Sequence, residues 1–172
     1  RAVTATYVPT RPDLLDVMFD VGREAGYKGN FNQWVIDSLE EGDVVVVDMY
    51  DKIYKGTFLG GNLTTALKNK TQNENGGAVI WGGIRDVEQM KKVPDVQVYY
   101  RGIDPTPIRE FVMKDWNGIT NFGGAVCLPG DVVFGAGGGV LCVRLQPAGG
   151  IPDPAVGRHP LFHRHGTCRN RR

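Results

Sequence analysis

Residues 60–86 have the sequence GGNLTTALKNKTQNENGGAVIWGGIRD, and this stretch gives the clearest succession of structural signals in the chain. The Gly60–Gly61 pair opens a segment over 62–75 that is expected to be helical and to be closed by the next pair of glycines. The apolar run GGAVIWGGI then has the composition of a buried strand. Arg85 and Asp86 follow where this strand ends. The stretch therefore predicts a glycine turn, a helix, a strand and two adjacent residues of opposite charge.

This order of residues suits the binding of a small oxo-acid together with a divalent cation. Backbone N–H groups at the start of a helix, here at Gly60–Gly61, attract a carboxylate. Arg85 can bind a carboxylate or an enolate with two parallel hydrogen bonds. Asp86 supplies a hard oxygen ligand of the kind that magnesium prefers. A surface ion pair that follows a core strand would explain the same two residues, so the spacing alone leaves both interpretations open.

Strands and helices are expected on both sides of this stretch. Alternation predicts a strand over 2–8, a continuous β-branched run predicts a buried strand over 42–50, and a third strand is expected over 95–103. Helices are expected to begin near Pro12, over 32–41 and over 86–92. Several short strands broken by glycine are expected over 119–143. The fold class is therefore α/β with a substantial antiparallel or barrel component.

The length and composition of the chain are those of one soluble domain. It has 172 residues, of which 41% are hydrophobic, enough for one core. It has no apolar run of the ~20 residues that cross a bilayer, and its first residues show no secretory pattern. Cys127, Cys142 and Cys168 form no CxxC pair, which argues against a disulfide framework. The expected location is the cytoplasm, without a membrane contact.

The composition changes abruptly near Val143. Residues 144–172 contain six arginines and no lysine, all three histidines of the chain, and Asp153 as their one acid. This segment has neither helical nor strand periodicity. We therefore expect a domain over residues 1–142 and a frameshifted or disordered tail over 143–172.

Two motifs in the tail suggest zinc or nucleic acid as a ligand, but the surrounding sequence supports neither. His159-x3-His163-x-His165-x2-Cys168 has a spacing that is possible for zinc, but it has no second cysteine pair and no fold around it. The arginines of the tail lack interleaved aromatic residues, so they predict only nonspecific attraction to nucleic acid. No zinc site and no specific nucleic-acid partner are expected.

The glycine-rich run VVFGAGGGV at 132–140 has the glycine spacing of a dinucleotide or methyltransferase loop. Such a loop needs a βαβ unit of about 30 residues, with a helix directly after the glycines. The sequence after 140 is the aberrant tail. We therefore interpret the glycines as a tight turn between strands.

The order glycine–x–leucine, helix, apolar strand and Arg–Asp in residues 60–86 resembles the signature of the RraA-like family. Three further segments match the family in order: AVTATYVPTRPDL at 2–14, EEGDVVVVD at 40–48 and GGAVCLPGDVVFG at 123–135. The resemblance thus covers about residues 2–141, which makes it far more specific than a single motif. The family includes class II 4-hydroxy-4-methyl-2-oxoglutarate/4-carboxy-4-hydroxy-2-oxoadipate aldolases and the regulator of ribonuclease activity A. Its members often carry the name demethylmenaquinone methyltransferase.

The resemblance implies a swivelling β/β/α layered fold around a small β-barrel, assembled as a homotrimer, with a hexamer as the alternative. Relative to the family pattern, the chain begins in the first or second core strand and is expected to lack an N-terminal helical segment. It is also expected to lack the C-terminal amphipathic helix.

The resemblance also implies roles for the central residues. The backbone of Gly61, Asn62 and Leu63 would bind the substrate carboxylate. Arg85 would bind the oxo-acid oxygens, and Asp86 would hold Mg²⁺ or Mn²⁺ mostly through water. The implied activity is that of a metal-dependent lyase acting on a small 2-oxo acid. It would cleave a 4-hydroxy-2-oxo acid by a retro-aldol reaction, or decarboxylate oxaloacetate, and release pyruvate through a stabilised enolate.

Two positions depart from the aldolase pattern. The aldolases carry an acid after the glycine, where this chain has Asn62, and a second acid three residues after the aspartate, where it has Gln89. A non-enzymatic regulator that binds ribonucleases, or an inactive gene remnant, are therefore the alternative interpretations. Asp86 favours the enzyme, because a metal-binding acid has no evident purpose in a scaffold. Metal-dependent release of pyruvate would separate these classes.

Overall fold

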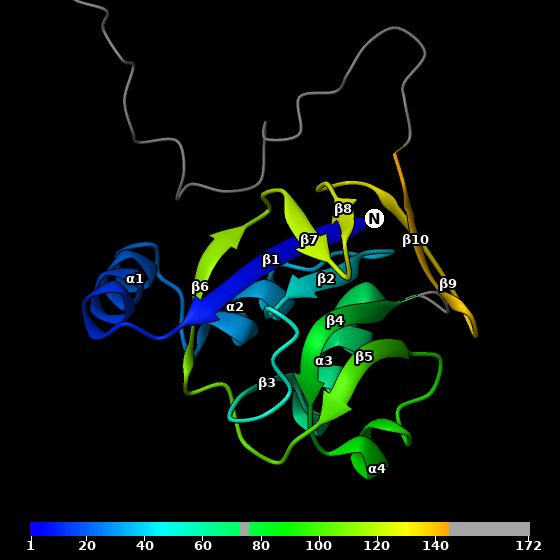
Figure 1. The fold of residues 1–172 in the computed structure, drawn as a ribbon, viewed down its shortest axis with the longest axis horizontal. Helices are drawn as coiled ribbons and strands as arrows, with labels where there is room; N and C mark the ends of the chain where they lie inside the picture. Colours follow the sequence, from blue (N-terminus) through cyan, green and yellow to red (C-terminus); the bar gives the residue numbers. More distant parts are fainter. Residues whose placement is uncertain (73–75, 145–172) are drawn as a thin grey trace, which may run out of the picture.

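The computed structural model describes residues 1–72 and 76–144 (Figure 1). The main sheet has six strands: β1 (Ala2–Pro9), β2 (Val44–Asp48), β3 (Thr57–Leu59), β4 (Gly77–Ile84), β5 (Gln97–Ile103) and β6 (Phe111–Trp116). The helices are α1 (Pro12–Glu24), α2 (Phe31–Asp37), α3 (Gly61–Thr71) and α4 (Val87–Met90). Two hairpins complete the described part: β7 (Thr120–Phe122) with β8 (Ala125–Cys127), and β9 (Val132–Ala136) with β10 (Gly139–Val143).

The strands of the main sheet are mostly parallel and follow the order β5–β4–β2–β1–β6, with β6 antiparallel to β1. On one edge of β4, β2 pairs with residues 77–81 and β3 pairs with residues 83–84. A strand has two hydrogen-bonding edges and β5 occupies the other, so β2 and β3 lie one after the other along the same edge. The result is a mixed α/β fold built on a curled half-barrel sheet, which confirms the predicted class.

Both faces of this sheet are covered, and the alternation along β2 shows how. Val45 and Val47 point into a core shared with the helices, whereas Val44 and Val46 point toward the two hairpins. Successive side chains of a strand face opposite sides, so a strand covered on both faces has no polar alternation. This explains the continuous apolar run and confirms the predicted buried strand.

An aromatic cluster holds α1 and α2 against the sheet. Trp34 of α2 stacks on Tyr27 at 5.4 Å between ring centroids and meets Phe31 edge-on at 4.9 Å. The indole lies directly against Gly22 of α1, where an added Cβ would be 2.0 Å from the ring. Close packing of the two helices therefore requires the glycine, and Pro12 occupies the first turn of α1 as expected.

The structure corrects the predicted extents of two helices. The segment over 62–75 was expected to be closed by glycines, but α3 ends at Thr71, where Gln72 adopts the left-handed conformation with φ 49°. Gly77 already belongs to β4, and residues 73–75 lie outside the described residues. The helix expected over 32–41 ends at Asp37.

Two strands, β3 and β6, were not predicted. β3 has three residues, too few to show a period. In β6, the residues FVM are all buried, so the first half of the strand shows no alternation. After Met113 the register against β1 shifts, and a bulge of this kind interrupts the alternation that a strand prediction depends on.

The glycine-rich run over 132–140 forms an antiparallel pair, β9 with β10, so the prediction of a tight turn is confirmed. Cys127 and Cys142 are both free thiols. None of the helices in residues 1–72 and 76–144 is long and apolar enough to cross a membrane. The expected aberrant tail began at residue 143, but Val143 is the last residue of β10. The tail from residue 145 onward, with the zinc-like motif, lies outside the described residues, and the expectations about both ends of the chain stay predictions.

Candidate functional site

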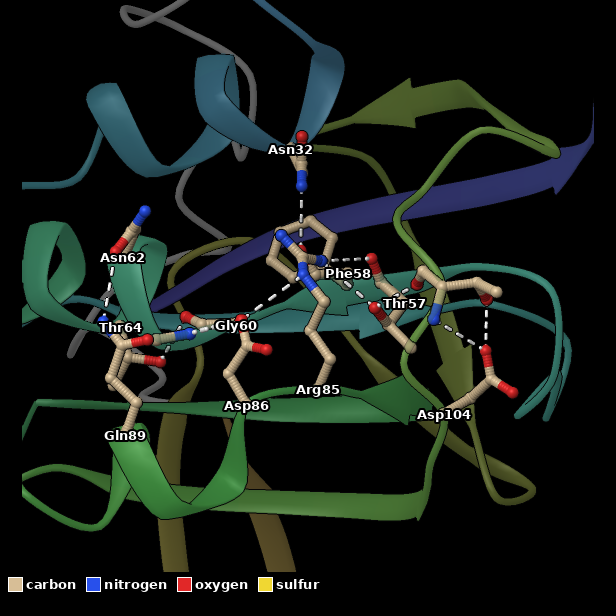
Figure 2. A network of polar contacts seen from close by, with 12 residues as sticks. Asn32, Thr57, Phe58, Gly60, Asn62, Thr64, Arg85, Asp86, Gln89 and Asp104 are labelled. Carbon is tan, nitrogen blue, oxygen red and sulfur yellow. Dashed lines mark hydrogen bonds and ion pairs between the residues drawn. The ribbon is translucent and has the colours of Figure 1, made fainter.

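The predicted site residues meet where β3 and β4 end. β3 leads through Gly60 into α3, and β4 leads through Arg85 and Asp86 into α4 (Figure 2). Because β3 and β4 are parallel and paired, both of their carboxyl ends lie at the same edge of the sheet. The backbone N–H of Arg85 donates to the carbonyl of Leu59 at 2.9 Å and joins the two ends directly.

The guanidinium of Arg85 is anchored by Thr57. Its Nη1 lies 3.1 Å from Thr57 Oγ1 and 3.3 Å from the Thr57 carbonyl oxygen. Thr57 is fully buried, and its hydroxyl donates to the carbonyl of Thr106 at 2.7 Å. The far side of the guanidinium is therefore fixed to β3, while its Nε faces Asp86.

Asp86 is held in an unusual backbone conformation. It has φ 55° and ψ 36° in the left-handed region, which is uncommon outside glycine but which aspartate and asparagine adopt more often than other residues. It occupies the N-cap position of α4 but makes no side-chain cap there. Instead, its Oδ2 accepts from the backbone N–H of Gly61 at 3.3 Å and lies 3.5 Å from Arg85 Nε.

Close approach explains both glycines of the turn. An added Cβ at Gly60 would lie 2.7 Å from Asp86 Oδ2 and 2.8 Å from Arg85 Nε. An added Cβ at Gly61 would lie 2.3 Å from Oε1 of Gln89. Gly60 is in ordinary extended backbone, with φ −139°. The glycines therefore leave room for the side chains of Asp86, Arg85 and Gln89 against the start of α3, and neither is explained by a left-handed turn.

The first turn of α3 is fixed by Gly60 and Thr64. The carbonyl of Gly60 accepts from the backbone N–H and from the hydroxyl of Thr64, both at 2.9 Å. The first N–H groups of a helix have no intrahelical acceptor. The amides of Asn62 and Leu63 are of this kind; the Asn62 side chain is exposed, whereas Leu63 packs against the core.

Gln89 of α4 and Asn62 of α3 form a pair of side-chain amides. Nε2 of Gln89 donates to Oδ1 of Asn62 at 3.1 Å, beside the Gly61 backbone (Figure 2). Sequence reasoning considered the two residues separately. Their contact depends on how α4 packs against α3, for which the spacing along the chain gives no signal.

A protein-family comparison matches residues 1–142 to the model described as RraA-like: Aldolase/RraA. The chain belongs to the RraA-like family. This confirms the resemblance found in the sequence, and a comparison with curated proteins gives no significant match.

Solved structures agree with this RraA-like assignment. RraAS2 from Streptomyces coelicolor, an unusual member of the RNase ES inhibitor RraA protein family, is 26% identical with a TM-score of 0.64. The match covers 83% of this chain and 62% of RraAS2, so this chain spans less than two thirds of that protein.

Two more distant structures share the fold alone. The RNA-processing inhibitor RraA from Thermus thermophilus is 19% identical with a TM-score of 0.60, over 87% of this chain and 77% of that one. The S-adenosylmethionine: 2-dimethylmenaquinone methyltransferase from Geobacillus kaustophilus HTA426 is 20% identical with a TM-score of 0.60, over 84% and 76%.

A divalent cation at the RraA-like site would have Asp86 as its one nearby carboxylate among the described residues and would stay largely hydrated. Within residues 1–72 and 76–144, no group of three or more His, Cys, Asp or Glu side chains could enclose a metal. Magnesium is commonly held by one or two carboxylates and keeps several waters. The carboxylate of Asp86, 48% exposed, meets that requirement. Asn62 and Gln89 contribute no charge, so the cation would depend on Asp86 and on oxygens of the substrate.

Sequence reasoning missed Thr57, which holds Arg85 in place. Thr57 lies in the unpredicted strand β3, and its contact with Arg85 arises from the pairing of β3 with β4. The sequence around it, GTFLGG, carries no sign of this role. By contrast, the structure does bring together all the residues that the sequence nominated: Gly61, Asn62, Leu63, Arg85 and Asp86 lie around the start of α3.

Proposed function

We propose that this RraA-like protein is a divalent-metal-dependent lyase that releases pyruvate from a small 2-oxo acid. One observation carries the proposal: Asp86 Oδ2 lies 3.3 Å from the Gly61 amide and 3.5 Å from Arg85 Nε. A carboxylate, a guanidinium and the first backbone amide of α3 therefore meet at this point, with the carboxylate in contact with both of the others.

These groups divide the recognition of a 2-oxo acid between them. The amides of Gly61, Asn62 and Leu63, with the positive end of the α3 dipole, suit the substrate carboxylate. Arg85, already oriented by Thr57, offers charge-assisted hydrogen bonds to the oxo oxygen. Asp86 would hold Mg²⁺ or Mn²⁺, which when bound supplies Lewis-acid stabilisation of negative charge on oxygen.

In both candidate reactions the bond between C3 and C4 breaks and its electron pair passes to C3, giving the enolate of pyruvate. In retro-aldol cleavage the 4-hydroxyl loses its proton and C4 becomes a carbonyl carbon. In decarboxylation of oxaloacetate the C4 carboxylate leaves as CO₂. A proton then returns to C3. Arg85 stabilises the negative charge that develops on the enolate oxygen.

The amide pair favours decarboxylation over retro-aldol cleavage. Asn62 and Gln89 are neutral and cannot accept the proton of a 4-hydroxyl. Loss of CO₂ needs no such base. We therefore expect oxaloacetate to be the better of the two substrates.

A second candidate function is the regulation of a ribonuclease by protein binding. RraAS2, which is 26% identical, is a member of an RNase ES inhibitor family. The outer face of the β9–β10 hairpin also carries exposed apolar side chains, with Phe134 at 64% and Leu141 at 58% exposure, paired in register. Such a face suits contact with another protein or with further copies in the expected homotrimer.

The test is to incubate the purified protein with oxaloacetate or 4-hydroxy-4-methyl-2-oxoglutarate, with Mg²⁺, Mn²⁺ or chelator, and to follow pyruvate by a coupled assay. We expect metal-dependent pyruvate that is lost in Arg85→Ala and in Asp86→Ala. Glu88→Ala is the matched control, because Glu88 is an exposed acid of α4 that pairs with Lys91 instead. A folded trimer that yields no pyruvate would contradict the lyase and favour the regulator.

A further inference from the structure

Asp86 occupies the same donors that the proposed function assigns to the substrate. One oxygen, Oδ2, accepts from the Gly61 amide and faces Arg85 Nε. These contacts place a carboxylate of the protein itself at the start of α3, against the arginine. A substrate carboxylate that approached the same groups would have to compete with it.

The two partners in this contact are held unequally. Arg85 is 22% exposed and is anchored at Nη1 by the hydroxyl and the carbonyl of Thr57. Asp86 is 48% exposed, and its polar contacts at 3.3 and 3.5 Å are long for charge-assisted bonds. Displacing the contact therefore moves the aspartate and leaves the guanidinium in position.

The backbone shows that this placement is not the default for the residue. An aspartate at an N-cap position normally accepts a hydrogen bond from its own helix. Asp86 makes no such bond, although it is the N-cap of α4, and it holds a left-handed φ of 55°. The carboxylate is thus directed away from its own helix and toward the start of its neighbour.

We propose that Asp86 is an internal competitor of the oxo-acid, and that it releases Gly61 and Arg85 when it binds a divalent cation. The inference rests on the proposed function and adds an order of binding to it. Without a cation, the carboxylate of Asp86 occupies the donors and the oxo-acid binds weakly. With a cation, Asp86 turns toward it and the two donors become available. By linkage, the oxo-acid strengthens cation binding by the same factor.

The decisive measurement is the binding of pyruvate to metal-depleted protein, by calorimetry or by ¹³C NMR, with no turnover involved. Removing the competitor in Asp86→Asn should tighten pyruvate binding about threefold to fivefold without metal, the range expected when a partly exposed charge contact is removed. Asp86→Ala should behave alike, which separates loss of the charge from any new contact made by the asparagine amide. Added Mg²⁺ should tighten binding to the unmodified protein and leave both variants unchanged.

Two controls isolate the contact from general electrostatics. Glu88→Gln removes one negative charge from α4 without touching Gly61 or Arg85, and should leave pyruvate binding unchanged. In Arg85→Ala/Asp86→Asn the gain should disappear, because the released donor is missing.

The possible outcomes distinguish failure of this inference from failure of the proposed lyase function. Equal metal-free affinity in the unmodified protein and in Asp86→Asn, or an equal gain in Glu88→Gln, would overturn the internal competitor while leaving the lyase proposal intact. Absence of pyruvate binding in every protein, with and without Mg²⁺, would overturn both.

Discussion

The two faces of the curled sheet carry hydrophobic cores of different size. One face packs against α1, α2 and α3, and its core contains the largest fully buried side chains, among them Trp34, Tyr7 and Phe58. The other face lies under the β7–β8 and β9–β10 hairpins. Its core among the described residues consists of Ala2, Val46, Val79, Phe122 and Cys127.

The candidate site lies on the helices that pack on the face with the larger core. α3 and α4, whose first residues form the site, both contribute side chains to the core shared with the helices, including Leu67 and Met90. The hairpin face ends in exposed apolar residues such as Phe134. The comparison indicates that the helices carrying the site also contribute to the larger core, whereas the hairpin face exposes apolar side chains to solvent.

The largest expected effect compares Val47→Ala with Val46→Ala, two neighbours on β2 that are both fully buried and point to opposite faces. Val47→Ala should lower the free energy of unfolding by about 2–3 kcal/mol, because the helices cannot close the resulting cavity. Val46→Ala should cost about 1.5 kcal/mol, close to the transfer term alone, because short hairpins can relax. Urea denaturation measures both, and equal losses would show that the hairpins pack as rigidly as the helices.

A smaller effect separates the site from the core beneath it. Gly60→Ala would place a Cβ 2.7 Å from Asp86 Oδ2 and 2.8 Å from Arg85 Nε, and so displace both side chains. We expect pyruvate binding in the presence of Mg²⁺ to weaken about tenfold. The free energy of unfolding should change by less than about 1 kcal/mol, because the displaced atoms belong to partly exposed side chains and not to the backbone.

Gly138→Ala in the β9–β10 turn is the matched control, since an added Cβ there meets nothing within 4 Å. It should alter neither pyruvate binding nor unfolding. If Gly60→Ala unfolded the protein, the start of α3 would be part of the core and not only of the site.

The last effect concerns the hairpin face and is absent near neutral pH. Burial raises the pKa of the Cys127 thiol well above its ordinary value, and burial also raises the pKa of Cys142, with which Cys127 interacts. The folded protein therefore keeps a proton that the unfolded chain releases above about pH 8.5. Stability should be unaffected by this group below that pH and should fall above it, by at most about 1.4 kcal/mol per pH unit.

Thermal unfolding between pH 7.5 and 10 measures this loss. Cys127→Ala should give a shallower decline, while Cys142→Ala, which replaces a half-buried thiol, should change the slope less. Burial also raises the pKa of Tyr7, but this contribution is common to all three proteins. Parallel curves for the three proteins would show that the Cys127 thiol ionises as easily in the folded state as in the unfolded one.

The sequence predicted the features that depend on local pattern. β2 and β4 were recognisable as apolar runs because both faces of the sheet are covered, and α1 was recognisable from Pro12. The nearness of Gly61 to Arg85 and Asp86 was predicted from a family signature. Such a signature reflects residues that lie close together in the fold shared by the family.

The remainder depends on packing between distant segments. The three residues of β3 become a strand only through pairing with β4, and β6 shows no alternation because its first three residues are all buried. The same reason hid Thr57 as the anchor of Arg85, and Gln89 as the residue that fills the space above Gly61. None of these contacts leaves a period or a composition in the sequence.

The hydroxyl of Thr57 links the arginine to a loop that takes no part in the site. Its one proton goes to the carbonyl of Thr106, so its oxygen is available as the acceptor for Arg85, and Thr57 also bridges to Pro107. A ligand that binds the guanidinium and weakens its contact with Thr57 should therefore change the local stability of the connection between β5 and β6. The rate of amide hydrogen exchange over residues 104–110 should then report whether Arg85 has bound a ligand, without a label near the site.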